Sequence, residues 1–194
     1  MRVIAGRWKG RRLKSPTGDG VRPTTDRVKE ALFNILGSEV RGCLFLDLCC
    51  GAGGLGIEAL SREAAQVVFV DRCRESLALV RENLTACGAD MGNTRLVCAD
   101  APAWVARWQP PVREGSWILV ADPPYRSTVA GAIMRELERL AGDPGFRLGI
   151  VEHGIRTPDL KMDSPGALDW SSRRYGESCL AVARLTRDGP DQGE

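Results

Sequence analysis

The sequence predicts an α/β fold in which helices cover both faces of a mostly parallel sheet. From residue 43 onward, apolar runs of strand length alternate with segments whose apolar residues recur at helical spacing. Several of these runs are closely followed by an aspartate. Such alternation is typical of parallel strands joined by right-handed helical crossovers. At 194 residues, the chain is long enough for one domain with a substantial core.

Residues 1–23 predict a basic extension that precedes the main domain. Two β-prone stretches, residues 2–5 and 11–13, flank a glycine-bounded turn and indicate a small hairpin. Trp8 lies in that turn, where it could stack on an unpaired base or cap the hairpin against the body. The sequence leaves both roles open.

A helix is predicted after the loop at residues 15–23. Thr24 or Thr25 can cap its first turn, and Gly37 ends it. The regular alternation follows within a domain that spans residues 24–186. The predicted strands are 43–48, 66–70, 94–98, 117–121 and 148–151. Four helices are predicted between and after these strands. The first runs from 55 to about 62, and the second has Leu77, Val80, Leu84 and Cys87 on one face and ends at Gly88. The third covers 101–108, and the fourth runs from Ser127 or Thr128 to Leu140.

The C-terminal part predicts a closing hairpin. Residues 171–175 and 178–185 are β-prone and flank Gly176-Glu177. Glu152 and His153 are expected to follow the fifth strand, and residues 154–170 fit only a short helix. Residues 187–194 are predicted to be a disordered tail.

Composition narrows the class of protein. Hydrophobic residues make up 43% of the chain and charged residues 27%, which is ordinary for a globular protein. There is no run of about 18 apolar residues and no apolar leader, so we expect a cytoplasmic protein without a membrane span. Cys43, Cys49, Cys87 and Cys98 have apolar neighbours and predict reduced, buried thiols. One histidine and no C-x-x-C pair give no metal-ligand spacing, so no metal is expected.

The charge is unevenly distributed although the net charge is only +2. Residues 1–30 carry nine basic and three acidic residues, a net charge of +6, whereas the remainder has a net charge of −4. This asymmetry favours a polyanion-binding end on a nearly neutral body, although a solvated arm without a partner has the same composition. The candidate contacts to such a polyanion, which would include RNA, are Lys9, Arg11, Arg12, Lys14 and Arg22.

A glycine-rich turn follows the first strand of the main domain. Gly51, Gly53 and Gly56 satisfy G-x-G-x-x-G between a strand and a helix, which fits NAD, FAD, S-adenosylmethionine or a tight turn without a ligand. Asp47 lies four residues before the first glycine, where its carboxylate would repel a diphosphate. The same carboxylate suits the amino and sulfonium groups of S-adenosylmethionine.

A second motif follows the strand at 117–121. Two prolines cannot continue a central strand, so the chain must turn at Asp122-Pro123-Pro124-Tyr125. A carboxylate, a rigid turn and an aromatic ring therefore meet at the carboxyl end of one strand, where open α/β sheets bind ligands.

These stretches carry a family resemblance. The segment 47–56 resembles motif I of class I S-adenosylmethionine-dependent methyltransferases, and 122–125 resembles the D/N-P-P-Y/F motif of enzymes that methylate exocyclic nitrogens. The segment 22–36 resembles the N-terminal signature of the RsmD family, which methylates N2 of one guanine in 16S rRNA. The resemblance covers about residues 2–185. It implies a Rossmann-like class I methyltransferase fold with a seven-stranded sheet, S-adenosylmethionine as cofactor and, as partner, 16S rRNA within a small-subunit assembly particle.

The resemblance also implies roles for individual residues. Asp71 would accept hydrogen bonds from the ribose hydroxyls, and Asp100 with the amide of Ala101 would bind the adenine. The Asp122 carboxylate and the Pro123 carbonyl would orient the target amino group, and Tyr125 would stack on the base. Cys49-Cys50 departs from the family, which commonly has an aromatic residue and alanine there.

Other functions share parts of this pattern. The Asp-Pro-Pro-Tyr motif also serves adenine N6 and cytosine N4 in DNA or other RNAs, but no separate target-recognition domain is evident. A non-catalytic RNA-binding assembly factor would explain the basic arm but not the intact motifs. An NAD-dependent enzyme is disfavoured by Asp47. We expect a monomeric rRNA methyltransferase.

Overall fold

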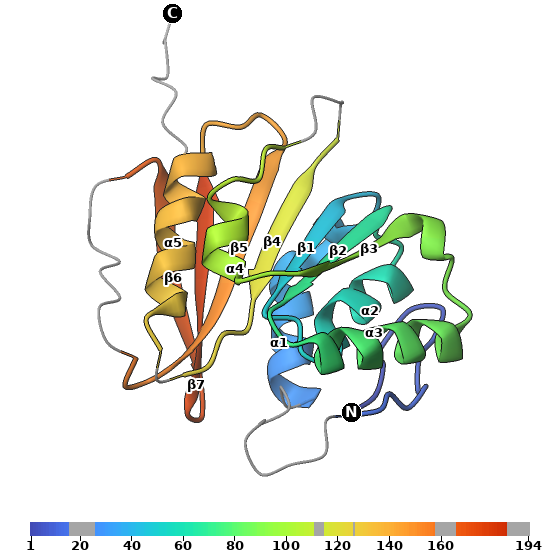
Figure 1. The fold of residues 1–194 in the computed structure, drawn as a ribbon. Helices are drawn as coiled ribbons and strands as arrows, with labels where there is room; N and C mark the ends of the chain where they lie inside the picture. The colour runs from blue at the N-terminus through green and yellow to red at the C-terminus, as the bar shows by residue number, and fades with distance from the viewer. Residues whose placement is uncertain (16–25, 111–114, 126, 158–165, 186–194) are drawn as a thin grey trace, which may run out of the picture.

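The protein, described by a computed structural model over residues 1–15, 26–110, 115–125, 127–157 and 166–185, is built on one seven-stranded sheet. The strand order is β3-β2-β1-β4-β5-β7-β6 (Figure 1), with β1 to β5 parallel and β7 antiparallel to both neighbours. The predicted mostly parallel sheet is therefore confirmed. The strands are β1 (Leu44–Leu48), β2 (Gln66–Asp71), β3 (Thr94–Cys98), β4 (Trp117–Ala121), β5 (Phe146–Gly154), β6 (Leu168–Tyr175) and β7 (Ser178–Leu185).

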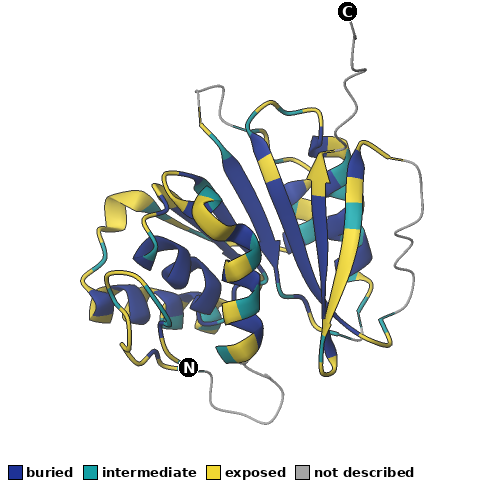
Figure 2. Ribbon diagram, turned by 180° about the vertical axis from the view of Figure 1, so that it is seen from behind, coloured by how far each residue is buried: buried dark blue, intermediate teal, exposed yellow. Residues whose placement is uncertain are grey.

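Helices cover both faces of this sheet, as predicted. One apolar layer lies between the sheet and α1, α2 and α3, and a second lies between the sheet and α4 and α5 (Figure 1). The central strands are buried along most of their length (Figure 2) because both faces are covered. The helices are α1 (Asp26–Leu36), α2 (Gly54–Ser61), α3 (Arg74–Cys87), α4 (Ala101–Val105) and α5 (Val129–Leu140), with 3-10 turns at Gly37–Val40 and Met91–Asn93.

The strand order reverses direction at β1, which places a ligand crevice there. β1 pairs with β2 on one side and with β4 on the other. Leu48 is in register with both Val70 and Ala121, so the three strands end at one level. Asp71 and Asp122 therefore flank the turn that follows β1, and open α/β sheets bind ligands at such a point.

The closing hairpin forms at the far edge of the sheet. Gly176 adopts the left-handed conformation, with φ of 66°, between β6 and β7. β7 is buried along most of its length, whereas β6 is the mostly exposed outer strand (Figure 2).

The N-terminal hairpin is less regular than predicted. Residues 1–13 form a loop closed by one antiparallel bridge, between Arg2 and Arg12. The amides of Ile4 and Ala5 do not extend the ladder, because they donate to the Glu58 carboxylate on α2 at 2.7 and 2.9 Å. Residues 1–15 are called the N-terminal arm below.

Three element predictions were wrong in extent. β6 begins at Leu168 rather than residue 171, so residues 168–170 of the segment expected to fit only a short helix are strand, because they pair with β7. α4 ends at Val105 rather than residue 108, and its last turn tightens into hydrogen bonds from Arg107 N to Trp104 O and from Trp108 N to Val105 O. β5 extends to Gly154, so Glu152 and His153 lie inside the strand and pair with β7.

Some predictions lie outside the described residues or need correction. The caps at Thr24 and Thr25, the contact residue Arg22 and the tail at 187–194 lie outside the described ranges. Cys98 is exposed, not buried, because it lies on the outer edge of the sheet. Within the part of the chain that the structure describes, no helix has the length and apolar composition to cross a membrane. The same residues contain no cluster of three side chains suited to a metal ion.

Candidate active site

The carboxyl ends of β1 to β4 surround a cleft of about 630 Å³, a volume typical of small-molecule sites. Eight of the ten residues predicted to act in cofactor binding or catalysis line it. Two do not, Gly53 and Gly56. The residues that line the cleft are Asp47, Gly51, Asp71, Asp100, Ala101, Asp122, Pro123 and Tyr125.

The three motif glycines have different physical roles. Gly51 and Gly53 have φ of 52° and 81°, so the turn requires residues that tolerate the left-handed region. A Cβ at Gly56 would lie 2.3 Å from the Phe69 ring, so this glycine lets α2 pack closely on β2. Only Gly51 of the three borders the cleft.

Asp47 is fully buried at the floor of the cleft. Its Oδ2 accepts a hydrogen bond from the Gly56 amide at 2.8 Å, whereas its Oδ1 has no partner among the described residues. Burial, with the charges of Asp122 and Asp71, raises the pKa of Asp47 well above its ordinary value. An unpartnered buried oxygen in a cleft with three further aspartates fits a cationic ligand.

Asp71 and Asp100 each organise the backbone around the cleft. Asp71 accepts hydrogen bonds from the amides of Gly51 and Cys73, both at 2.9 Å. Asp100 caps α4 by accepting from Ala103 N at 3.0 Å. A carboxylate oxygen can accept more than one hydrogen bond, so both residues keep capacity for a ligand.

The Asp122-Pro123-Pro124-Tyr125 turn is fixed at both ends. Asp122 N donates to Leu48 O at 3.2 Å, which joins the turn to the end of β1. The Tyr125 hydroxyl donates to Glu152 Oε1 and lies 2.7 Å from Ser178 Oγ. Burial and Glu152 together raise the pKa of Tyr125 above its ordinary value. Sequence reasoning missed Glu152 and Ser178, because their contact with Tyr125 depends on the pairing of β5 with β7.

The N-terminal arm forms part of the cleft wall, which the sequence did not indicate. Met1 lines the cleft and packs over α2, where a Cβ at Gly54 would lie 2.3 Å from its Sδ. Lys29 also lines the cleft, with a side chain that is 1% exposed. The sequence could have indicated that Lys29 is buried, because Lys29 lies three residues before Leu32 and therefore on the apolar face of α1.

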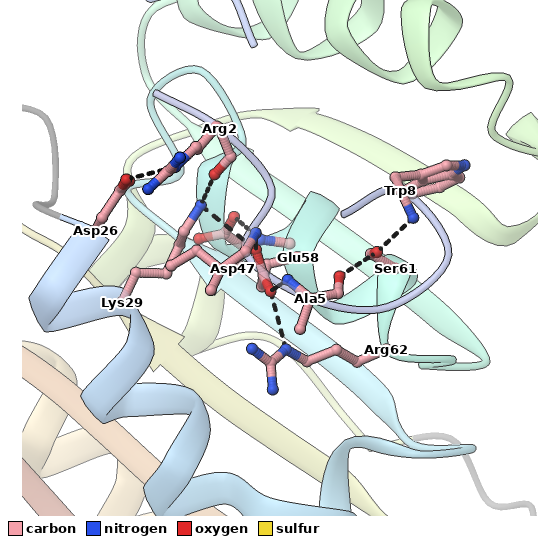
Figure 3. A network of polar contacts seen from close by, with 11 residues as sticks. Arg2, Ala5, Trp8, Asp26, Lys29, Asp47, Glu58, Ser61 and Arg62 are labelled. Atoms are coloured by element: carbon pink, nitrogen blue, oxygen red, sulfur yellow. Dashed lines mark hydrogen bonds and ion pairs between the residues drawn. The ribbon is translucent and has the colours of Figure 1, made fainter. Parts of the chain in front are cut away.

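Glu58 holds this wall in place (Figure 3). Its carboxylate lies 3.5 Å from Lys29 Nζ and 2.9 Å from Arg62 Nε, and it also accepts the amides of Ile4 and Ala5. Lys29 Nζ donates to the Arg2 carbonyl as well. Burial lowers the pKa of Lys29 because desolvation outweighs the attraction of Glu58.

The four described RNA-contact candidates differ in their availability. Lys9 and Arg12 are exposed on the arm. Arg11 donates to the Ala86 carbonyl and Lys14 forms an ion pair of 2.7 Å with Glu82, so both hold the arm against α3.

Trp8 is half-buried on the same arm. It packs against the core, and the Arg7 guanidinium lies 4.1 Å from its ring centroid. This packing corresponds to the capping role that the sequence left open.

Cys49 and Cys50 line the cleft as neutral thiols. Cys49 is half-buried rather than buried as predicted. Burial, with the surrounding aspartates, raises the pKa of Cys49 to about 12 and also raises the pKa of Cys50. Neither side chain therefore supplies a thiolate at neutral pH.

Comparisons with known proteins agree with this site. A family model described as "Conserved hypothetical protein 95" matches residues 1–183. "Ribosomal RNA small subunit methyltransferase D" of Escherichia coli K12 is 37% identical over 146 residues, which are 75% of this chain and 69% of that protein. The chain belongs to the RsmD family. It is accordingly a methyltransferase.

Further relatives support the RsmD assignment and the fold. YlbH of Bacillus subtilis, described as a candidate rRNA methyltransferase, is 52% identical over 84% of this chain and 89% of its own length. The solved structure of Escherichia coli yhhF, described as a candidate methyltransferase, has a TM-score of 0.75 and 31% identity over 95% of this chain and 97% of its own. The 23S rRNA methyltransferase ErmE, at 18% identity and a TM-score of 0.62 over 88% of this chain and 72% of its own, shares the fold. The predicted class I methyltransferase fold is thus confirmed.

Proposed function

We propose that this RsmD-family chain transfers a methyl group from S-adenosylmethionine to the exocyclic N2 of a guanine in 16S rRNA. One observation carries the proposal. The Asp122-Pro123-Pro124-Tyr125 turn shares one cleft, at the strand-order reversal, with the Asp47 carboxylate oxygen that has no partner among the described residues.

The residues of the cleft fit S-adenosylmethionine. The Asp47 Oδ1 would accept from the amino group, Asp71 from the ribose hydroxyls and Asp100 from the adenine amine, with the Ala101 amide beside the adenine. The cofactor supplies an electrophilic methyl group when bound. Lys29 is a buried cation at the arm side of the cleft and suits the cofactor's carboxylate.

The turn after β4 would make a weak nucleophile reactive. The lone pair of guanine N2 is delocalised into the ring, so the site must orient it. The Asp122 carboxylate and the Pro123 carbonyl would each accept one N–H of the amino group, which favours a pyramidal nitrogen directed at the methyl group. Asp122 can also take the proton that nitrogen loses after transfer. Tyr125 would stack on the base, which must be unpaired or flipped out to enter.

The N-terminal arm would provide electrostatic contacts to the RNA. Lys9 and Arg12 are exposed and can neutralise phosphates, and Arg22 is a further candidate. We propose a cytoplasmic monomer that acts on a small-subunit assembly particle.

The test of this site is methyl transfer from labelled S-adenosylmethionine to small-subunit particles that lack the modification. Asp122→Asn keeps the size of the side chain and should lower the rate of transfer about 10²- to 10³-fold. Asp169→Asn, at an exposed position on β6, is the matched control and should keep the wild-type rate. Near-normal transfer by folded Asp122→Asn would overturn the catalytic assignment. RNA binding without transfer by the wild type would favour a non-catalytic assembly factor.

A further inference from the structure

The Tyr125 side chain is held on several sides by residues that do not line the cleft. Its hydroxyl donates to Glu152 on β5 and lies 2.7 Å from Ser178 on β7. Its ring lies against Gly154, where a Cβ would be 3.1–3.3 Å from Tyr125 Cβ, Cγ and Cδ2. Its backbone carbonyl accepts from Thr157 Oγ1 at 2.9 Å. Tyr125 itself lines the cleft.

The proton count gives this chain of hydrogen bonds a direction. The Tyr125 hydroxyl has one proton, which is donated to Glu152 Oε1. The Ser178 hydroxyl must therefore donate to the Tyr125 oxygen. Glu152 is 1% exposed and Ser178 is 6% exposed, so water does not replace either contact.

The buried carboxylate of Glu152 is only half-satisfied by the described residues. Its Oε2 has no partner among the described residues, and no described ion pair includes it. The neighbours on its face of the sheet, such as Ile150 and Leu180, are apolar. A buried, half-satisfied carboxylate costs free energy, and its one described side-chain contact is with Tyr125.

We propose that Glu152, supported by Ser178, is a positioning residue that fixes the plane of the Tyr125 ring for the target base. This inference rests on the proposed function. Ala121 and Val151 are in register, so Asp122, directly after the end of β4, lies beside Glu152 on β5. A fixed ring plane sets the orientation in which a stacked base presents its amino group to Asp122. Glu152 acts through Tyr125 because it does not itself line the cleft.

The first experiment measures cofactor affinity and methyl transfer to the RNA separately. Glu152→Ala should lower kcat/KM for the rRNA particle about 10- to 100-fold, because a misplaced base reacts slowly, while the S-adenosylmethionine Kd stays within about twofold of the wild type. Glu152→Gln keeps an acceptor for the Tyr125 hydroxyl and should recover most of the activity. Tyr125→Phe should match Glu152→Ala, and the double variant should be no worse than either.

The second experiment tests the contact between Tyr125 and Glu152 without RNA, through the pKa of Tyr125. Tyr125 and Tyr175 are the two tyrosines of the chain, so ultraviolet titration of Tyr175→Phe reports Tyr125 alone. Glu152→Gln should lower the pKa of Tyr125 because it removes the carboxylate charge.

The outcomes distinguish this inference from the proposed function. Wild-type kinetics in folded Glu152→Ala, or an unchanged Tyr125 titration in Glu152→Gln, would overturn the positioning role. An equal loss of S-adenosylmethionine affinity would also overturn it, because general damage to the site would then explain the defect. Absence of guanine methylation by the wild type would instead contradict the proposed function, while the titration would still report the contact.

Discussion

Burial of the Asp47 carboxylate costs free energy in the folded protein, and the same burial favours binding of a cationic ligand. Its carboxylate is fully buried with one oxygen unpartnered among the described residues, an arrangement that disfavours the charged form in the ligand-free protein. A cationic ligand would relieve that cost by supplying a donor and a charge.

The Asp47→Asn variant should separate the two effects. Loss of a charged hydrogen bond should weaken S-adenosylmethionine binding by about 1.5–3 kcal/mol, measured by calorimetry against the Asp169→Asn control. Equal affinity of variant and wild type would remove Asp47 from the cofactor site.

The Asp47→Asn variant also tests how the free energy of unfolding depends on pH. Because the pKa of Asp47 is raised in the folded state from its ordinary value of 3.8, folded protein binds more protons than unfolded protein above that pH. The wild-type free energy of unfolding therefore falls as pH rises from about 4 toward the folded-state pKa, by up to about 1.4 kcal/mol per pH unit. Asp47→Asn lacks this contribution, so its stability relative to the wild type should rise with pH in urea unfolding without ligand. A difference independent of pH would contradict the assignment.

At the scale of the element, the seating of α2 on β2 depends on Gly56. A Cβ there would lie 2.3 Å from Phe69 Cε1 and 2.8 Å from Val67 Cγ1, both in the core. Gly56→Ala should lower the free energy of unfolding by about 1–3 kcal/mol through overpacking. Gly142→Ala is the control, because a Cβ there meets nothing within 4 Å and no left-handed φ is required. Equal urea midpoints would show that α2 can shift freely.

The N-terminal arm is a second element, and Glu58 is one of the residues that hold it. Glu58→Ala leaves Lys29 buried without its carboxylate and should destabilise the protein by about 3–5 kcal/mol. The arm should also detach, with faster tryptic cleavage at Arg7 and Lys9. The control is Glu63→Ala, whose ion pair with Arg41 is exposed and should contribute little. A cleavage rate in Glu58→Ala equal to that of the wild type would show that the Glu58 contacts do not hold the arm.

The sequence predicted the end of an element correctly where a proline or glycine next to it stops the strand or helix. The strand at 117–121 ends where two prolines follow, and α3 ends at Gly88, which is left-handed. The extent of β5 was not predictable, because the polar Glu152 and His153 remain in the strand only through pairing with β7.

The same distinction applies to the site. The predicted residues that line the cleft belong to two short motifs and to the ends of neighbouring strands, so sequence could identify them. The supports Glu58, Lys29, Glu152 and Ser178 come from distant parts of the chain, and only the fold brings them to the motifs.

At the scale of the whole molecule, positive charge is concentrated on the arm. Removing one basic side chain that binds a phosphate should reduce the slope of log K against log salt by about 0.7–0.9. The Lys9→Ala and Arg12→Ala variants should each flatten the salt dependence of RNA binding. Arg147→Ala, at the amino end of β5 and away from the arm, should not. A slope equal to that of the wild type in all three variants would exclude Lys9 and Arg12 from the interface.

The central claim concerns the atom that is methylated. The most direct measurement incubates wild-type protein and labelled S-adenosylmethionine with unmodified small-subunit particles, digests the RNA and identifies the labelled nucleoside by mass. The proposed function predicts N2-methylguanosine from the wild type and almost none from Asp122→Asn. Label on adenosine or cytidine, or transfer to another nucleic acid but not to these particles, would contradict it.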